Sequence, residues 1–243
     1  MPQHKVLVIA GTDSSGGAGL LRDVAVLHEF GVHSRVAVTA VTAQTDATVS
    51  AIHHVTPAIV GAQISTALAC NDVGVVKIGM LGTAATVHAV ADALKDFRGR
   101  IICDPVLEST SGAELLDLAG RRAMIDHLLP RVDLLTPNIP EAAALIGEPM
   151  ARDDIHLVLQ AIALRALGPS ILLKGGHSAS TTCDDLLLQR DGSLTWFRAT
   201  RLPGFMRGSG CALASAIAAQ LVMGTTLREA CGLARDHVRR GWC

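Results

Sequence analysis

The sequence predicts an α/β protein built on a mostly parallel sheet. Of its 243 residues, 49% are hydrophobic and 18% are charged, which is enough apolar material for one large core. Short aliphatic runs of strand length alternate along the chain with segments of helical periodicity. This alternation is typical of a parallel sheet covered by helices on both faces. Because no linker, repeat or low-complexity segment divides the chain, we expect residues 1–243 to form a single domain.

The N-terminal half is expected to supply the first strands and their connecting helices. Lys5 to Ala10 is a short apolar run that ends at a glycine-rich loop, and apolar residues recur at helical spacing after that loop, up to Phe30. Thr56 suits the N-cap and Pro57 the first position of another helix. The expected elements are strands at 5–10, 36–41, 49–55, 73–78 and 101–103, and helices at 20–30, 57–69 and 84–97.

The C-terminal half continues the alternation and adds a hairpin. Asp191-Gly192 is a turn sequence between two short apolar runs at 185–189 and 194–199. The other expected elements are strands at 132–135 and 170–174, and helices at 119–129, 140–146, 155–167, from Gly210 onward, and 227–239. In such sheets, ligands bind beyond the carboxyl ends of the strands, so we expect the functional residues there.

Composition excludes several classes of protein. A net charge of -1, no basic run and only 2% aromatic residues argue against a nucleic-acid partner. The apolar run before Gly11 is too short for a signal peptide or a membrane span, and Ser215 and Gln220 interrupt the longest later run. We therefore expect a cytoplasmic protein with no membrane partner. Six cysteines without metal-ligand spacing argue against a zinc site or a disulfide framework.

Gly208-Ser209-Gly210 directly precedes a strong helix-forming segment. The unpaired N–H groups and the positive dipole end of a helix start bind anions, so this loop is a candidate phosphate cradle. Cys211 follows in the same field, which favours ionisation of a thiol, and we expect it to act as a base or nucleophile. The alternative is a plain turn in which Cys211 is a small buried apolar residue.

Polar residues follow several of the expected strands. Asp104 and Glu141 are hard oxygen donors suited to Mg²⁺, and Lys174 suits a phosphate. Together with the anion cradle they are the parts of a phosphoryl-transfer site. Singly, each could be a turn or surface residue. The loop from Gly11 to Gly19 has neither the P-loop ending nor GxGxxG, which argues against a Walker-type NTPase or a Rossmann dehydrogenase.

These stretches carry a family resemblance that covers nearly the whole chain. The sequence resembles hydroxymethylpyrimidine/phosphomethylpyrimidine kinases, the thiamine-pathway members of the ribokinase-like family. The matching stretches are Ala10-Gly11-Thr12-Asp13-Ser14 with Gly16-Gly17-Ala18-Gly19, Thr39 to Gln44, Lys77 to Leu81, Asp104-Pro105-Val106, Thr136-Pro137-Asn138 to Glu141, Lys174 to His177, and Gly208 to Cys211.

The resemblance implies a fold and an activity. The fold would be a ribokinase-like three-layer α/β/α sandwich with a mostly parallel central sheet, formed by one kinase domain over residues 1–243. The activity would be ATP- and Mg²⁺-dependent phosphorylation of 4-amino-5-hydroxymethyl-2-methylpyrimidine to its monophosphate, and then of the monophosphate to the diphosphate, in thiamine biosynthesis. A homodimer is left open. The same fold leaves two alternatives, a pyridoxal kinase and a catalytically weakened pyrimidine-binding paralogue.

The resemblance also assigns the site residues. The family's Asn-x-x-Glu metal motif falls on Asn138 and Glu141, and its pyrimidine-binding glutamine falls on Gln44. The expected catalytic residues are Gly208, Ser209, Gly210 and Cys211; the substrate-binding residues are Gln44, Gly11, Asp13, Ala18, Met80 and Val106; the nucleotide-binding residues are Lys174, Asn138, Asp104 and Arg207; and the metal ligands are Glu141 and Asp104.

Among the positions that depart from the family pattern, two bear on the charge near the site. Arg207 stands where a histidine is usual, and it either contacts a phosphate or faces solvent. Thr110 stands where a lysine is expected near the acceptor. Because adding phosphate to an anionic acceptor depends on nearby cations, the loss of that lysine predicts better phosphorylation of the alcohol than of the monophosphate.

Overall fold

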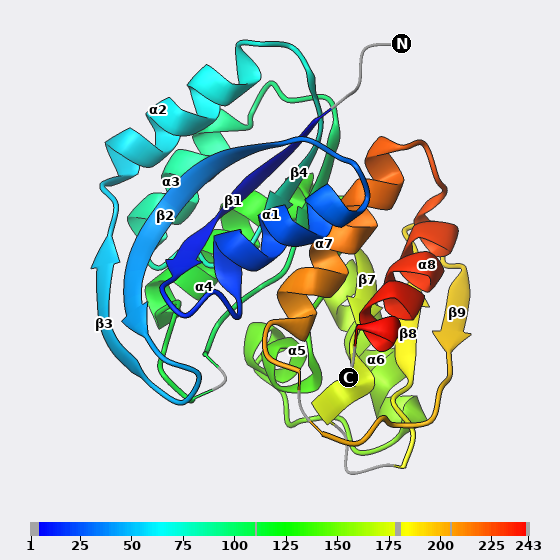
Figure 1. The fold of residues 1–243 in the computed structure, drawn as a ribbon. Helices are drawn as coiled ribbons and strands as arrows, with labels where there is room; N and C mark the ends of the chain where they lie inside the picture. The colour runs from blue at the N-terminus through cyan, green and yellow to red at the C-terminus, as the bar shows by residue number, and fades with distance from the viewer. Residues whose placement is uncertain (1–4, 110, 178–180, 205, 242–243) are drawn as a thin grey trace.

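A nine-stranded sheet forms the centre of the molecule, with the strand order β3-β2-β1-β4-β5-β6-β7-β8-β9 (Figure 1). The structure, a computed structural model, describes residues 5–109, 111–177, 181–204 and 206–241. The strands are β1 (Lys5–Asp13), β2 (Ser34–Gln44), β3 (Val49–His54), β4 (Val73–Ile78), β5 (Arg100–Cys103), β6 (Leu134–Leu135), β7 (Ser170–Leu173), β8 (Asp185–Leu188) and β9 (Leu194–Phe197). Neighbours from β2 to β7 pair in parallel, whereas β3, β8 and β9 join as antiparallel edges. The mostly parallel sheet and the C-terminal hairpin predicted from the sequence are confirmed.

Helices cover both faces of the sheet, which completes the predicted three layers. The helices are α1 (Gly19–Glu29), α2 (Pro57–Leu68), α3 (Ala84–Ala93), α4 (Leu118–Ala123), α5 (Ile139–Ile146), α6 (Asp154–Arg165), α7 (Ser209–Val222) and α8 (Leu227–Arg240). In Figure 1, α1, α7 and α8 lie in front of the sheet. Helices α2 to α6 supply the buried apolar residues of the opposite face.

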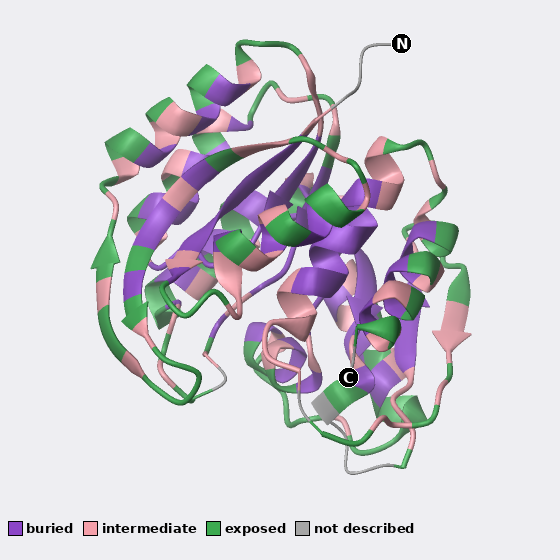
Figure 2. Ribbon diagram, viewed as in Figure 1, coloured by how far each residue is buried: buried purple, intermediate pink, exposed green. Residues whose placement is uncertain are grey.

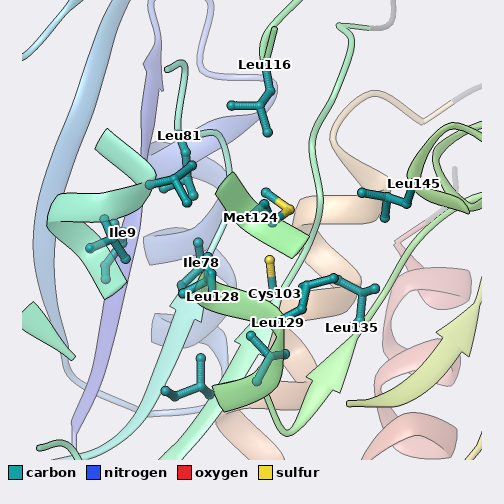
Figure 3. Packing of buried hydrophobic residues seen from close by; sticks show 14 of the residues in the cluster. Ile9, Ile78, Leu81, Cys103, Leu116, Met124, Leu128, Leu129, Leu135 and Leu145 are labelled. Atoms are coloured by element: carbon teal, nitrogen blue, oxygen red, sulfur yellow. The ribbon is translucent and has the colours of Figure 1, made fainter. Parts of the chain in front are cut away.

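Two hydrophobic cores lie on the two faces of the sheet, and β1 contributes to both. Because successive side chains of a strand point to opposite faces, Leu7 and Ile9 enter the core beneath α2 to α6, whereas Val6 and Val8 enter the core beneath α1, α7 and α8. The strand is buried on both sides, as its unbroken apolar sequence predicts (Figure 2). Figure 3 shows the first of these cores, where side chains of the sheet meet those of the helical segment that includes Met124.

The segment predicted as one helix over 119–129 is wrong as a regular α-helix. α4 ends at Ala123, a π-helical turn follows over Met124–Leu128, and a 3₁₀ turn covers Leu129–Arg131. Pro130 has no N–H to donate and so cannot sit within a continuing α-helix. The helix predicted over 84–97 also ends early, at Ala93.

Strands β1 and β2 run further than the predicted 5–10 and 36–41. The pairing of β1 with β2 shifts register between Ala10 and Thr12 and then resumes, so that Asp13 pairs with Thr42. This irregularity keeps the polar Gly11 to Asp13 segment in the sheet. It carries Asp13 and Gln44, the last residues of two parallel strands, to the same edge of the sheet.

None of the helices in the described part of the chain is both long and apolar enough to cross a membrane.

Candidate active site

The carboxyl ends of the parallel strands gather most of the predicted site residues at one edge of the sheet. Met80 follows β4, Asp104 follows β5, Asn138 follows β6 and Lys174 follows β7. Asn138 and Lys174 form an isolated parallel bridge, and the Lys174 N–H donates to the Pro137 carbonyl at 2.8 Å. The parallel pairing of the sheet therefore brings together residues that are far apart in the sequence.

Lys174 and Asp104 form a largely buried ion pair at this edge. The Lys174 Nζ donates to Asp104 Oδ1 at 2.8 Å, and the Thr136 hydroxyl donates to the same oxygen at 3.1 Å. Burial alone would raise the pKa of Asp104, but Lys174 and Lys77 hold it below its ordinary value. Burial alone would lower the pKa of Lys174, but the charges of Asp104 and Glu141 raise it above its ordinary value. Both groups are therefore ionised at neutral pH.

Glu141 lies beside this pair and is held by a capping box at the start of α5. The Glu141 N–H donates to Asn138 Oδ1 and the Asn138 N–H donates to Glu141 Oε2, each at 2.8 Å. Glu141 Oε2 lies 3.9 Å from Lys174 Nζ. Burial, and then the nearby Asp104 charge, raise the pKa of Glu141 to about 7, although Lys174 opposes this.

The acidic residues suit a metal that binds together with phosphates. Mg²⁺ commonly takes only one or two carboxylates from a kinase, with its other ligands from nucleotide and water. Glu141 and Asp104 supply that number, and the raised pKa of Glu141 reflects a buried negative charge that a cation would compensate. Among the described residues no group of three or more His, Cys, Asp or Glu could hold an ion without such help. These two carboxylates fit a Mg²⁺ ion that binds together with the nucleotide. Lys174 lies 3.9 Å from Glu141 and 2.8 Å from Asp104, so Glu141 is the less strongly paired of the two.

The loop that begins α7 packs closely on the glycine-rich loop after β1. Gly208 is the N-cap of α7 and has a φ of 71°, and a Cβ at this position would collide with the carbonyl oxygen of Gly17. Only glycine combines that backbone conformation with that approach. A Cβ at Gly210 would lie 3.1 Å from Lys174 Nζ and 3.5 Å from Asp104 Oδ2. The N-terminus of α7 thus lies close to the Lys174–Asp104 pair, and binding of an anion there stays a prediction.

Cys211 is half-buried in the first turn of α7, where two opposing effects act on the pKa of its thiol. Burial raises the pKa of Cys211 to about 11, although Lys77 acts in the opposite direction. Loss of solvation therefore outweighs the favourable field of the helix N-terminus, and the role of Cys211 as a base stays a prediction. Cys211 carries its proton at neutral pH.

A fully buried ion pair lies close enough to act on Cys211. Lys77 Nζ contacts Asp23 Oδ1 and Oδ2 at 2.8 and 2.7 Å, and the Ser215 hydroxyl donates to Asp23 Oδ1 at 2.7 Å. Neither charged side chain is exposed. Burial alone would lower the pKa of Lys77, but Asp23 raises it. The buried pairing of Lys77 was not predicted from the sequence, although a lysine inside the apolar strand Val73–Ile78 requires a buried acidic partner.

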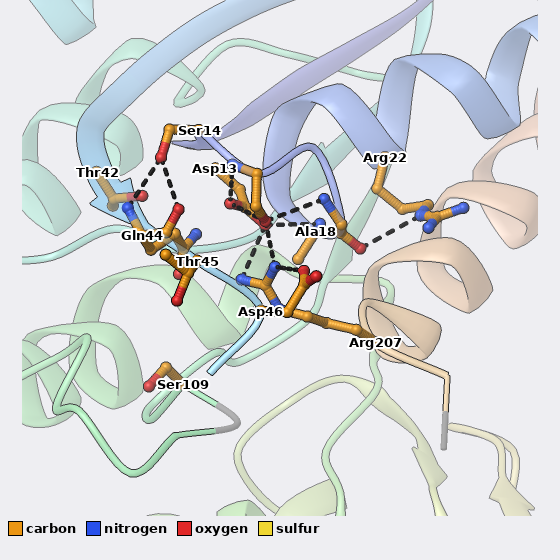
Figure 4. A network of polar contacts seen from close by, with 12 residues as sticks. Asp13, Ser14, Ala18, Arg22, Thr42, Gln44, Thr45, Asp46, Ser109 and Arg207 are labelled. Atoms are coloured by element: carbon orange, nitrogen blue, oxygen red, sulfur yellow. Dashed lines mark hydrogen bonds and ion pairs between the residues drawn. The ribbon is translucent and has the colours of Figure 1, made fainter. Parts of the chain in front are cut away.

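The predicted acceptor-binding residues lie around the ends of β1, β2 and β4. A Cβ at Gly11 would lie 2.9 Å from the Met80 sulfur, so these two residues are in close proximity. The Ser14 hydroxyl donates to the Gln44 carbonyl at 2.9 Å and accepts from the Gln44 N–H at 2.8 Å, which fixes the backbone of Gln44 (Figure 4). Within the described residues, the side-chain amide of Gln44 forms no hydrogen bond. Val106 is half-buried beyond β5.

The Asp13 carboxylate forms hydrogen bonds within its own loop. Its carboxylate accepts hydrogen bonds from the Ser15 N–H and hydroxyl, both at 2.8 Å, and from the Ala18 N–H at 2.9 Å. Asp13 and Ala18 thus shape the glycine-rich turn. Contact of either residue with a substrate stays a prediction.

Arg207 does not face solvent, so that alternative is wrong. Its guanidinium lies 3.0 Å from Asp13 Oδ2 and 3.0 Å from Asp46 Oδ1, and it also contacts the Ser15 hydroxyl (Figure 4). These partners lie on the glycine-rich loop and on the turn after β2, beside residues predicted to bind the acceptor, and contact of Arg207 with a nucleotide stays a prediction. The contact of Asp46 with Arg207 was not predicted from the sequence. Thr110 lies outside the described residues.

Solved structures with the same architecture are kinases. One is the phosphomethylpyrimidine kinase from Clostridium difficile 630, with a TM-score of 0.86 and 29% identity over 98% of this chain and 99% of that one. Another is the pyridoxal kinase from Staphylococcus aureus in complex with AMP-PCP and pyridoxal, with a TM-score of 0.88 and 26% identity over 97% of this chain and 86% of that one. The fold and the cluster of charged residues at the start of α7 define a small-molecule kinase of the ribokinase-like class.

Sequence comparison narrows the class to a family. The model of the phosphomethylpyrimidine kinase family matches residues 13–241. A hydroxymethylpyrimidine/phosphomethylpyrimidine kinase from Rhizobium meliloti (strain 1021) is 38% identical over 234 residues, which cover 96% of this chain and 88% of the relative. The chain belongs to the phosphomethylpyrimidine kinase family.

Proposed function

We propose that this kinase transfers the γ-phosphoryl group of ATP to the hydroxymethyl oxygen of 4-amino-5-hydroxymethyl-2-methylpyrimidine, and then to the phosphate of the resulting monophosphate. One observation carries the proposal. Lys174 lies next to Asp104 and Glu141, and this group lies beside Gly210 at the start of α7. Phosphoryl transfer depends on positioning and charge neutralisation, and this cluster supplies both.

Each of these groups has a distinct task in the proposed reaction. The backbone N–H groups at the start of α7 receive the transferring phosphoryl group, and Lys174 balances its charge. Glu141, with Asp104 beside it, would hold the Mg²⁺ that accompanies the nucleotide. That ion would neutralise the phosphate oxygens as the bond to the leaving group breaks. The pyridoxal kinase structure with AMP-PCP supports the same use of ATP by this chain.

Cys211 is the candidate base at the acceptor oxygen. Only its thiolate can take the proton, and the high pKa keeps that form scarce at neutral pH. Lys77 lowers the pKa of Cys211 and thus favours the reactive form. A loose transition state needs little deprotonation before the new bond forms, so a scarce base is tolerable.

An assay of ATP consumption separates this proposal from its rivals. The pyrimidine alcohol, pyridoxal and ribose should be offered separately at equal concentration. We expect the alcohol to have the highest kcat/KM. A preference for pyridoxal would favour the second candidate, which the structural likeness to the Staphylococcus aureus enzyme supports. Calorimetric binding of the pyrimidine without turnover of any acceptor would indicate a weakened paralogue.

Gln44 is expected to recognise the pyrimidine. Its side-chain amide has no hydrogen bond within the described residues and can accept from the exocyclic amine while donating to the adjacent ring nitrogen. Gln44→Leu should weaken acceptor binding by about 1–3 kcal/mol, because the amine is left unpaired in a desolvated site. Calorimetry with the alcohol checks this. Nucleotide affinity serves as the control and should not change, whereas unaltered acceptor affinity would remove Gln44 from the pocket.

A further inference from the structure

Three loops meet at the guanidinium of Arg207. The residue itself comes directly before the anion cradle, Asp13 and Ser15 belong to the glycine-rich loop after β1, and Asp46 belongs to the turn between β2 and β3 (Figure 4). A Cβ at Gly17 would lie 2.9 Å from Arg207 Nη1 and 3.3 Å from its Cδ, so the arginine side chain packs closely against the glycine-rich loop. Arg207 is thus fixed between the cradle and the acceptor pocket.

The two carboxylates that hold Arg207 are unlike each other. The Asp13 side chain is 1% exposed and is also fixed by its own loop, so its contact with Arg207 Nη2 is a permanent part of the structure. The Asp46 side chain is 88% exposed, and it contacts Arg207 Nη1 from the solvent side. An ion pair that is open to solvent on one side contributes little to stability.

The charges of this group do not cancel. One guanidinium faces two carboxylates, so the cluster of Asp13, Asp46 and Arg207 carries a net charge of -1. Asp46 lies two residues after Gln44, whose backbone is tied to Ser14 of the glycine-rich loop. The extra negative charge therefore stands near Gln44, the residue expected to bind the acceptor, and it contacts Arg207 Nη1 from the solvent side.

We infer that Asp46 determines the charge selectivity of the kinase, by occupying Arg207 and so disfavouring a phosphorylated acceptor relative to a neutral alcohol. The inference rests on the proposed function. A neutral hydroxymethyl group binds beside the cluster without disturbing it. A phosphate is repelled by the net charge, or it must displace Asp46 before Arg207 can bind it in the paired geometry that guanidinium and phosphate prefer.

Asp46→Asn tests the inference, because it removes one negative charge while keeping the size of the side chain. The exposure of Asp46 makes a folding defect an unexpected outcome, and thermal unfolding checks this. We expect kcat/KM for the monophosphate to rise about three- to tenfold and that for the alcohol to change less than twofold, as expected for one charge acting through a partly solvated site. Asp92→Asn, on an exposed position of α3 on the opposite face of the sheet, makes the same change of net charge and should leave both values unaltered.

A second variant assigns the gain to Arg207. In an Arg207→Gln background, Asp46→Asn should raise monophosphate activity less than twofold, because no guanidinium is left to release. An unchanged ratio of the two kcat/KM values in Asp46→Asn would overturn the inference. Should the parent phosphorylate neither acceptor, the proposed function fails, and calorimetry then decides the inference alone: it survives only if Asp46→Asn tightens binding of the monophosphate and not of the alcohol.

Discussion

At Cys211, the field of a helix terminus and the loss of solvation act in opposite directions. The helix start and Lys77 favour a thiolate, yet burial dominates and raises the pKa to about 11. The sequence offered both the favourable field and a buried Cys211 as alternatives, but it could not show which effect is larger. A thiol at the start of a helix is therefore a poor guide to its ionisation until its surroundings are known.

The raised pKa predicts how activity should depend on pH. Below the pKa of about 11, the thiolate fraction of Cys211 increases about tenfold per pH unit, so kcat should rise between pH 7 and 9 if the thiolate is the base. Cys211→Ala should lower kcat about a hundredfold at pH 8, abolish the rise, and leave nucleotide affinity nearly unchanged. Steady-state kinetics across this range, with thiolate absorbance measured in both proteins, provides the check. Full turnover in Cys211→Ala would reduce the residue to a small buried apolar group.

At the scale of elements, the start of α7 needs glycine at position 208 for two separate reasons, its backbone conformation and its close approach to another loop. Gly208 has a left-handed backbone and touches the Gly17 carbonyl, whereas Gly224, just after the same helix, has a φ of 92° but no atom within 4 Å of its Cβ position. Substitutions at these two glycines therefore distinguish the cost of a positive φ from the cost of moving the two loops apart.

Gly208→Ala should disrupt the cradle, and Gly224→Ala is its matched control. Alanine at either position carries the cost of a positive φ, about 1 kcal/mol. Only at Gly208 must the two loops also move apart, so we expect that variant to lose more than tenfold in kcat/KM and the control to keep it. Thermal unfolding and ATP consumption measure the two effects. Equal activity in both variants would show that the packing of these loops does not matter for transfer.

Elements and their order were readable from the sequence, because apolar periodicity and glycine or proline boundaries are local. The strand ends that carry Asp104, Asn138 and Lys174 followed from the same reading, since parallel strands bring their carboxyl ends to one edge. The break after α4 was missed because the apolar spacing continues through Met124–Leu128. The contact of Arg207 with Asp46 spans 161 positions of the chain, and no local pattern predicts it.

At the scale of the whole molecule, one ion pair connects the sheet with two helices of the same layer. Lys77 extends from β4, Asp23 lies on α1, and Ser215 on α7 completes the contact. All three side chains are fully buried. Lys77 therefore contributes both to the stability of the fold and to the electrostatics of the site, because its charge lowers the pKa of Asp104 and of Cys211.

Lys77→Met should therefore be strongly destabilising. The substitution preserves much of the apolar volume but leaves Asp23 buried without its cation, a loss of about 3–5 kcal/mol. Lys5→Met is the matched control: Lys5 contacts Asp72 at 2.9 Å near the surface, Asp72 keeps Arg35 as a partner, and the expected loss is about 0–1 kcal/mol. Urea unfolding, compared at equal m values, measures both. The double variant Lys77→Met with Asp23→Leu removes the unpaired charge and should regain most of the stability. It should not regain full activity, because the charge that lowers the pKa of Cys211 is gone, and recovery of both would show that the pair serves the fold alone.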